Sequence, residues 1–154
     1  MSDAEPYPLY PAHSVGAIIV TPDHRFLLQR RDHVPHIWYP GAWGLFGGGI
    51  DPGESERDAL RRELYEEIGL TLGEAHLFTR FQFDCAFVGD GMIDRAFFEV
   101  PVDLDTVAGL KLTEGLEMAL IEAERIVGLP DMIGHDGFAL YLYLHRRRIT
   151  RSSA

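Results

Sequence analysis

Three glutamates in one short segment have the residue type and spacing needed to hold a divalent metal ion. Glu63, Glu66 and Glu67 lie at positions i, i+3 and i+4, so at about 100° per residue they share one face of a helix. Like charges at this spacing destabilise a helix by roughly a few tenths of a kcal/mol per pair. Mg²⁺ would offset that repulsion, because it prefers oxygen ligands and usually binds carboxylates together with substrate phosphates. The pattern therefore indicates a Mg²⁺ site, with Mn²⁺ as the alternative ion, or else a solvated acidic face.

The residues just before this helix favour the metal site over the solvated face. Gly47, Gly48 and Gly49 have no side chains, so their backbone can approach a ligand closely. A turn signal, Asp51-Pro52-Gly53, follows them, and a fourth acid, Glu54, comes directly afterwards. Acids beside a glycine-rich loop are a suitable setting for a metal ion that also contacts phosphate.

Together these residues resemble a complete Nudix box. Gly48 is followed after five residues by Glu54, and after seven more by Arg62-Glu63-Leu64-Tyr65-Glu66-Glu67-Ile68-Gly69-Leu70. Every fixed position of the signature is filled, and residues 43–49 match its usual lead-in. The surrounding chain resembles the Nudix fold over about 13–148. The resemblance implies an α+β fold, an α/β/α sandwich with a mixed β-sheet between helices. It also implies hydrolysis of a nucleoside diphosphate linked to another moiety.

The resemblance assigns roles to the residues of the box by position. The expected metal ligands are the carboxylates of Glu63, Glu66 and Glu67 and the carbonyl of Gly48. Arg62 and Glu54 are expected to pair and to brace the loop against the helix. Because that role supports the ligands without contacting the metal, losing either residue should loosen the site without deleting a ligand.

The general base that activates water has several candidates. One is a carboxylate of the box itself. Another is Glu114, because Glu114-Gly115 resembles the Glu-Gly that some Nudix triphosphatases carry before the last strand. Glu117 is a close second, although Met118 follows it where relatives often have an aromatic residue. The alternative for both later glutamates is an ordinary polar loop.

Cationic and aromatic residues near the box are candidates for substrate binding. Arg30 and Arg31 end a predicted strand and point to opposite faces of it, so one of them can reach a substrate phosphate. Trp38, Tyr39 and Trp43 form an aromatic cluster, and aromatic faces stack on bases at about 1–3 kcal/mol each. The alternative is that these rings pack the loop.

The residues after the box limit the expected substrate class, because Nudix subfamilies carry marker residues there. The markers of subfamilies acting on ADP-ribose, diadenosine polyphosphates and NADH are not found there. Nucleoside triphosphates and nucleotide sugars remain as the expected small phosphorylated substrates. A non-catalytic, nucleotide-binding regulatory Nudix domain is the alternative function, although such a domain is expected to lose box carboxylates, and this chain keeps them.

Predicted elements place these residues around one sheet. Strands are expected over 13–21, 25–31, 43–46, 77–88, 92–102 and 117–121. The first two should form a hairpin, and Gly89-Asp90-Gly91 should turn a second hairpin between the fourth and fifth strands. A helix should begin at the N-cap Ser55 and end at Ile68 before Gly69. A loop is expected over 103–115, and further helices over 123–127 and 134–148. The chain is therefore predicted to be an irregular arm, 1–12, followed by a single domain, 13–150.

Composition limits the class of protein and of partner. The 154 residues, 46% hydrophobic and 25% charged, suit one soluble domain. No apolar run approaches the roughly 20 residues that span a bilayer, so no membrane partner is expected. The net charge of −10 argues against a large nucleic-acid surface. A single cysteine, Cys85, suits a cytoplasmic location. A homodimer that exchanges the aromatic arm is a further hypothesis.

Overall fold

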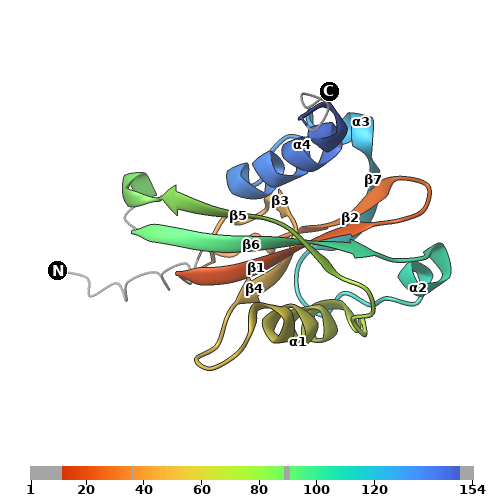
Figure 1. The fold of residues 1–154 in the computed structure, drawn as a ribbon, viewed down its shortest axis with the longest axis horizontal. Coiled ribbons are helices and arrows are strands. Elements are labelled where there is room, and N and C mark those ends of the chain that lie inside the picture. The colour runs from red at the N-terminus through yellow and green to blue at the C-terminus, as the bar shows by residue number, and fades with distance from the viewer. Residues whose placement is uncertain (1–11, 36, 89–90, 150–154) are drawn as a thin grey trace.

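Helices cover both faces of one mixed sheet, with α1 on one side and α4 on the other (Figure 1). The computed structural model describes residues 12–35, 37–88 and 91–149. The predicted arm, apart from Ala12, and Gly89-Asp90 of the predicted hairpin turn lie outside the described residues. In the described part of the chain the sheet has seven strands, so the expected α+β sandwich is confirmed.

The strands run both parallel and antiparallel. They are β1 (His13–Val20), β2 (Arg25–Arg30), β3 (Trp43–Gly44), β4 (Phe46–Gly49), β5 (His76–Asp84), β6 (Met92–Pro101) and β7 (Glu117–Glu122). The β1–β2 and β5–β6 pairs are antiparallel, as predicted. β1 also pairs with β4 antiparallel and with β6 in parallel, and β2 pairs with β3 and β7. β1 therefore lies at the centre of the sheet, beside the glycine strand β4.

The helices are α1 (Glu56–Ile68), α2 (Leu104–Ala108), α3 (Ala123–Ile126) and α4 (Gly134–Ile149), with a 3₁₀ turn, η1 (Ala86–Val88). None of the helices in the described ranges is both long enough and apolar enough to cross a bilayer. α1 begins and ends as predicted: the Ser55 hydroxyl accepts from the Asp58 N–H, and Gly69 adopts φ 69° and donates to the carbonyls of Leu64 and Tyr65.

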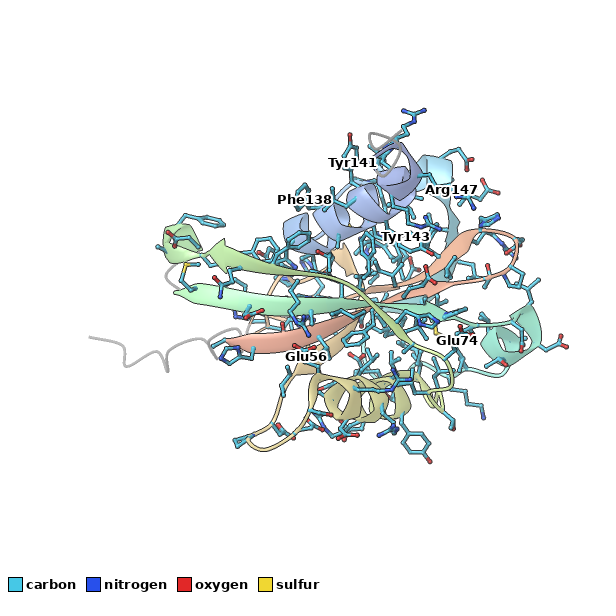
Figure 2. All side chains as sticks on the ribbon, viewed as in Figure 1. Glu56, Glu74, Phe138, Tyr141, Tyr143 and Arg147 are labelled. Carbon is cyan, nitrogen blue, oxygen red and sulfur yellow. The ribbon has the colours of Figure 1, made fainter. Side chains whose placement is uncertain are left out.

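Strand alternation divides the core into two layers. The layer under α1 includes Phe46, Leu60 and Leu64, and the layer under α4 includes Phe97 and Leu140. On α4 itself, Tyr143 points into the second layer, whereas Phe138 and Tyr141 lie on the outer face (Figure 2). α1 thus packs its apolar stripe on the sheet and leaves its acidic stripe beside β4.

Three predicted segments differ from the structure. The single strand expected over 43–46 is two short strands that break at Leu45, and the second continues through the glycines to Gly49. β5 ends at Asp84, because its carboxylate accepts from the Ala86 N–H and turns the chain into η1. A short helix, α2, replaces part of the loop expected over 103–115, because Asp103 caps it at the Thr106 N–H.

Candidate active site

The acidic face of α1 lies directly against the glycine strand β4. Glu67 Oε2 accepts a hydrogen bond from the Gly47 N–H at 2.9 Å. The Glu63 carboxylate occupies the space in front of Gly48, where a Cβ would lie 2.6 Å from its Cδ. Glu66 is the most exposed of the three, with 60% of its side chain accessible. Two of the three box carboxylates therefore touch bare backbone, and the third faces solvent.

Gly47 makes this close approach possible. Its φ is 135°, which L side chains rarely adopt, and a Cβ there would lie 2.1 Å from the Val15 carbonyl oxygen of β1. No side chain can be accommodated against that backbone oxygen. Because Gly47 has no side chain, its N–H is accessible to the Glu67 carboxylate of α1.

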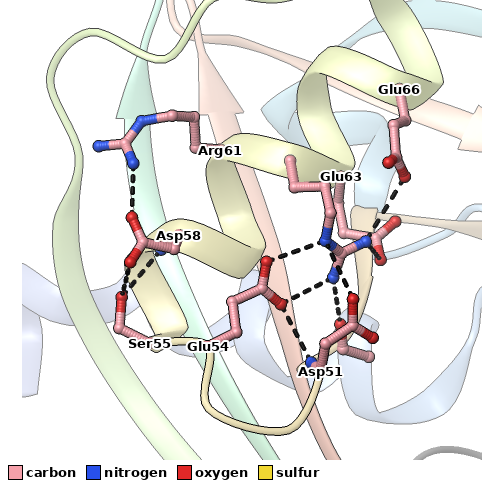
Figure 3. A network of polar contacts seen from close by, with 9 residues as sticks. Asp51, Glu54, Ser55, Asp58, Arg61, Glu63 and Glu66 are labelled. Atoms are coloured by element: carbon pink, nitrogen blue, oxygen red, sulfur yellow. Dashed lines mark hydrogen bonds and ion pairs between the residues drawn. The ribbon is translucent and has the colours of Figure 1, made fainter.

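Arg62 joins the helix to the loop that precedes it. Figure 3 shows the polar network between Asp51 and Glu54 of the loop and Glu63 and Glu66 of α1. Its Nε and Nη2 each donate to one oxygen of Glu54 at 2.9 Å, which is a bidentate pair. Nη2 also donates to the Gly49 carbonyl at 2.9 Å, and Nη1 donates to Glu63 at 2.7 Å. The Arg62 hydrogen bonds lower the pKa of Glu54 to about 2. One guanidinium thus ties together the loop, the end of β4 and a box carboxylate.

Burial dominates the electrostatics of the two inner glutamates. It raises the pKa of Glu67 to about 8, and the neighbouring Glu63 charge adds to the effect while the Gly47 N–H opposes it. Burial also raises the pKa of Glu63, against the lowering effect of Arg62. The positive charge and hydrogen-bond donors around these two carboxylates therefore do not fully stabilise their ionised forms.

The box glutamates supply the oxygen ligands that a hard divalent cation prefers, but their side chains do not converge on one point. In the described ranges, no three His, Cys, Asp or Glu side chains are close enough together to hold a metal ion. Glu63 is turned to Arg62, and Glu67 to Gly47. A cation would supply the missing positive charge beside both, and oxygen ligands of this kind suit Mg²⁺ or Mn²⁺.

A small hollow brings further predicted residues next to the acidic helix. It is lined by Gln29, Arg31, Asp32, Ile37, Glu67, Glu114 and Gly115. Arg31, Glu67 and Glu114 thus share one hollow, although they are far apart in the sequence. Glu117 does not line it: it begins β7, is exposed, and stands opposite Arg30 in the register with β2.

The remaining predicted substrate residues have structural contacts. Arg30 Nε donates to the Gly41 carbonyl at 3.1 Å, and Arg31 Nε donates to the Trp38 carbonyl at 2.6 Å. The Trp38 ring lies beside that of Tyr39, with centroids 5.5 Å apart. Trp43 packs against the core layer under α4. These contacts favour the packing interpretation for Trp43. The Trp38 carbonyl, in contrast, binds Arg31, which lines the hollow.

Comparison with known proteins gives the family. The profile of the NUDIX domain matches residues 11–125. The chain belongs to the Nudix hydrolase superfamily. Over 31 residues this Nudix hydrolase is 61% identical to the nucleoside triphosphatase NudI of Escherichia fergusonii, a match that covers 20% of the chain and only 22% of that relative.

Solved structures share the fold of this Nudix hydrolase across nearly its whole length. The MutT protein of Methanosarcina mazei Go1 superposes with a TM-score of 0.76 at 24% identity, covering 92% of this chain and 98% of that one. The NUDIX domain of Shewanella oneidensis NrtR, complexed with ADP ribose, superposes with a TM-score of 0.67 at 18% identity, covering 97% and 100%.

A buried polar group beside the Nudix site was not predicted from the sequence. Asp136, in the first turn of α4, accepts from the Leu45 N–H at 2.9 Å and from Arg95 Nε at 3.1 Å, and it contacts His135 Nδ1 at 3.0 Å. Gln29 donates to the Leu45 carbonyl at 3.0 Å. A polar residue within an otherwise apolar strand, such as Gln29 after two leucines in β2, could have indicated a buried hydrogen bond. Its partner could not be predicted, because the partner is remote in the sequence.

Proposed function

We propose that this Nudix hydrolase is a divalent-metal-dependent pyrophosphohydrolase that cleaves a nucleoside diphosphate linked to another moiety. The observation that carries the proposal is the contact of the acidic α1 face with bare β4 backbone, where Glu63 lies over Gly48 and Glu67 binds Gly47. No β4 side chain separates these carboxylates from the backbone, so a cation can contact both a carboxylate and a backbone carbonyl there. Residues 13–150 act in this proposal as one catalytic domain.

Mg²⁺, or Mn²⁺ in its place, would be held by Glu63, Glu66, Glu67 and the Gly48 carbonyl. When bound, the ion supplies neutralisation of the phosphate charge and a lower pKa for water. Arg62 holds Glu63 and the Gly49 carbonyl in place through its hydrogen bonds. Its role in the reaction is to fix the distance between α1 and the end of β4.

Glu114 is the general base in this proposal, since it lines the same hollow as Glu67, whereas Glu117 does not. Glu114 takes a proton from water as the water oxygen forms a bond to phosphorus. The bond from that phosphorus to the bridging oxygen breaks, and the leaving phosphate carries the electron pair. Arg31, in the same hollow, is placed to pair with a phosphate oxygen. A box carboxylate is the alternative base.

Nucleoside triphosphates are the substrate class we favour, ahead of nucleotide sugars. The support is the local identity to a protein named as a nucleoside triphosphatase. The hollow beside Glu67 is small, about 90 Å³, whereas pockets for whole ligands commonly reach a few hundred Å³. The hollow therefore suits a phosphate group, and the nucleoside would lie outside it.

Nucleotide binding without hydrolysis is the second candidate. Two observations favour it: the box carboxylates are not gathered around one point, and the fold resembles a NUDIX domain solved with ADP ribose. The retention of every box acid and of Arg62 favours hydrolysis instead.

A panel of nucleotides separates the two functions. The purified chain is incubated with nucleoside triphosphates, nucleotide sugars and ADP-ribose, with Mg²⁺ or Mn²⁺, and phosphate-containing products are measured. Metal-dependent turnover that is lost in Glu67→Gln supports the hydrolase. Tight binding of a nucleotide without turnover of any compound would establish the binding function and contradict the hydrolase.

A further inference from the structure

The break between β3 and β4 is fixed through both backbone groups of Leu45. Its N–H donates to Asp136 of α4, and its carbonyl accepts from Gln29 of β2. Both of these side chains are buried, with exposed fractions of 1% for Asp136 and 5% for Gln29. The backbone that leads into Gly47 is therefore held by two elements on either side of it.

Gln29 also reaches the acidic helix. Its side chain and the Glu67 carboxylate line the same hollow as Glu114, and the amide is near enough to oppose the raised pKa of Glu67. A glutamine amide has two N–H donors, so one can bind the Leu45 carbonyl while the other binds Glu67. The amide thus connects a metal-site carboxylate to the fixed backbone at Leu45.

The amide is not needed to fill the core of β2. Leu27 and Leu28, just before it, are fully packed apolar residues. A buried amide costs free energy unless its donors and acceptor are paired. An apolar side chain of the same length would fill the space but would leave the buried Leu45 carbonyl without its donor, so the amide is retained for its hydrogen bonding and not for packing.

We propose that Gln29 is a positioning residue that orients the Glu67 carboxylate for metal binding, anchored through Leu45 to Asp136 of α4. The proposal rests on the proposed function, in which Glu67 is a metal ligand. Groups that hydrogen-bond to metal ligands commonly change metal affinity or activity by about 10–100-fold when they are removed. Gln29 should have an effect of that kind, and most of it should depend on Glu67.

A double-mutant cycle tests this dependence. Gln29→Met removes the amide at nearly the same side-chain length, and it is combined with Glu67→Gln. The dissociation constant for Mn²⁺ is measured by electron paramagnetic resonance in all four proteins. Gln29→Met should weaken Mn²⁺ binding about tenfold when Glu67 is present and less than about twofold when it is absent. Gln82→Met, on the exposed side of β5, is the matched control and should change neither value.

Kinetics and thermal unfolding complete the test. Gln29→Met should lower kcat with KM changed less than about twofold, because the misplaced ligand acts on the reaction more than on binding. If Gln29→Met does not fold, Gln29→Asn replaces it, since the shorter amide cannot span both partners. Equal weakening of Mn²⁺ binding in both backgrounds, or a lower melting temperature with unchanged Mn²⁺ affinity, would overturn the proposal.

The cycle also distinguishes this proposal from the proposed function. An unmutated protein that binds Mn²⁺ but turns over no nucleotide would overturn the hydrolase, while the cycle would still report on Gln29. An unmutated protein that does not bind Mn²⁺ would overturn both.

Discussion

At the scale of single residues, the box carboxylates differ in how deeply the fold buries them. Glu66 is largely exposed, whereas burial raises the pKa of Glu67 to about 8. Burying an ionisable carboxyl group costs stability, and functional sites commonly accept that cost. Substitutions at these positions should therefore lower activity without lowering stability.

Glu66→Gln and Glu67→Gln should each lower turnover by several orders of magnitude and leave the fold intact. Neither removes an apolar contact, and the amide oxygen of Glu67→Gln can still accept from the Gly47 N–H, so the melting temperature should change little. Phosphate release and thermal unfolding measure the two properties. A fall in melting temperature that parallels the fall in activity would mean that the residues are structural.

Gly47 and Gly48 give a sharper contrast between adjacent residues. In Gly48→Ala the new Cβ meets the end of the Glu63 side chain, which can move aside, so we expect a small change in stability and a large loss of turnover. In Gly47→Ala the Cβ meets the Val15 backbone oxygen at 2.1 Å, at a positive φ, so the fold itself should be severely destabilised. Denaturant unfolding and turnover of both variants check this, and equal stabilities would contradict it.

At the scale of elements, α1 was predictable because its signals are local. The cap residue, the apolar spacing and the terminal glycine all lie within the segment that they define. The break at Leu45 was not predictable, because Gln29 and Asp136, which hold it, come from β2 and α4. α2 was not predicted, because none of its residues is buried and its sequence therefore shows no helical spacing of apolar residues.

The same distinction applies to the site. Spacing along the chain predicted that Glu63, Glu66 and Glu67 share one face of α1, but it did not decide between Glu114 and Glu117 as the proposed base. Only the packing of the loop against β2 places Glu114 in the hollow with Glu67. Asp136 and Arg95 escaped prediction because their pairing depends on the contact of α4 with β6.

The ends of α1 should each contribute measurably to stability. Ser55→Ala removes the N-cap acceptor for the Asp58 N–H and should cost about 1 kcal/mol. Gly69→Ala forces a side chain into the left-handed conformation and should cost about 1 kcal/mol as well. Gly73→Ala is the matched control, because a Cβ there meets nothing within 4 Å. Urea unfolding that places Gly69→Ala level with this control would contradict the cap assignment.

At the scale of the whole molecule, one buried carboxylate joins α4 to the sheet. Burial disfavours the charged form of Asp136, but the Arg95 charge, His135 and the Leu45 N–H outweigh that effect and lower its pKa to about 2. The ordinary value for an aspartate is 3.8. Asp136 therefore stabilises the fold above about pH 4, and this contribution is lost as the pH falls through about 2.

Asp136→Asn should accordingly destabilise the protein most at neutral pH. The substitution leaves the buried Arg95 without its ion-pair partner, and breaking such a pair costs about 3–5 kcal/mol. The difference from the unmutated protein should shrink by on the order of 2 kcal/mol between pH 5 and pH 2. Thermal unfolding across this range measures it, and a difference that is constant with pH would contradict the assigned pKa.

The parallel pairing of β1 with β6 has a consequence for the order in which the protein is made. His13 stands opposite Asp94 in that pair, and Phe98 and Val100 of β6 complete the apolar layer on which α1 rests. A chain emerging from the ribosome contains β1, β4 and α1 before it contains β6. Until β6 is made, the apolar layer under α1 has its β1 and β4 residues but lacks Phe98 and Val100. Formation of this distant pairing should therefore limit the rate at which the nascent chain reaches an active state.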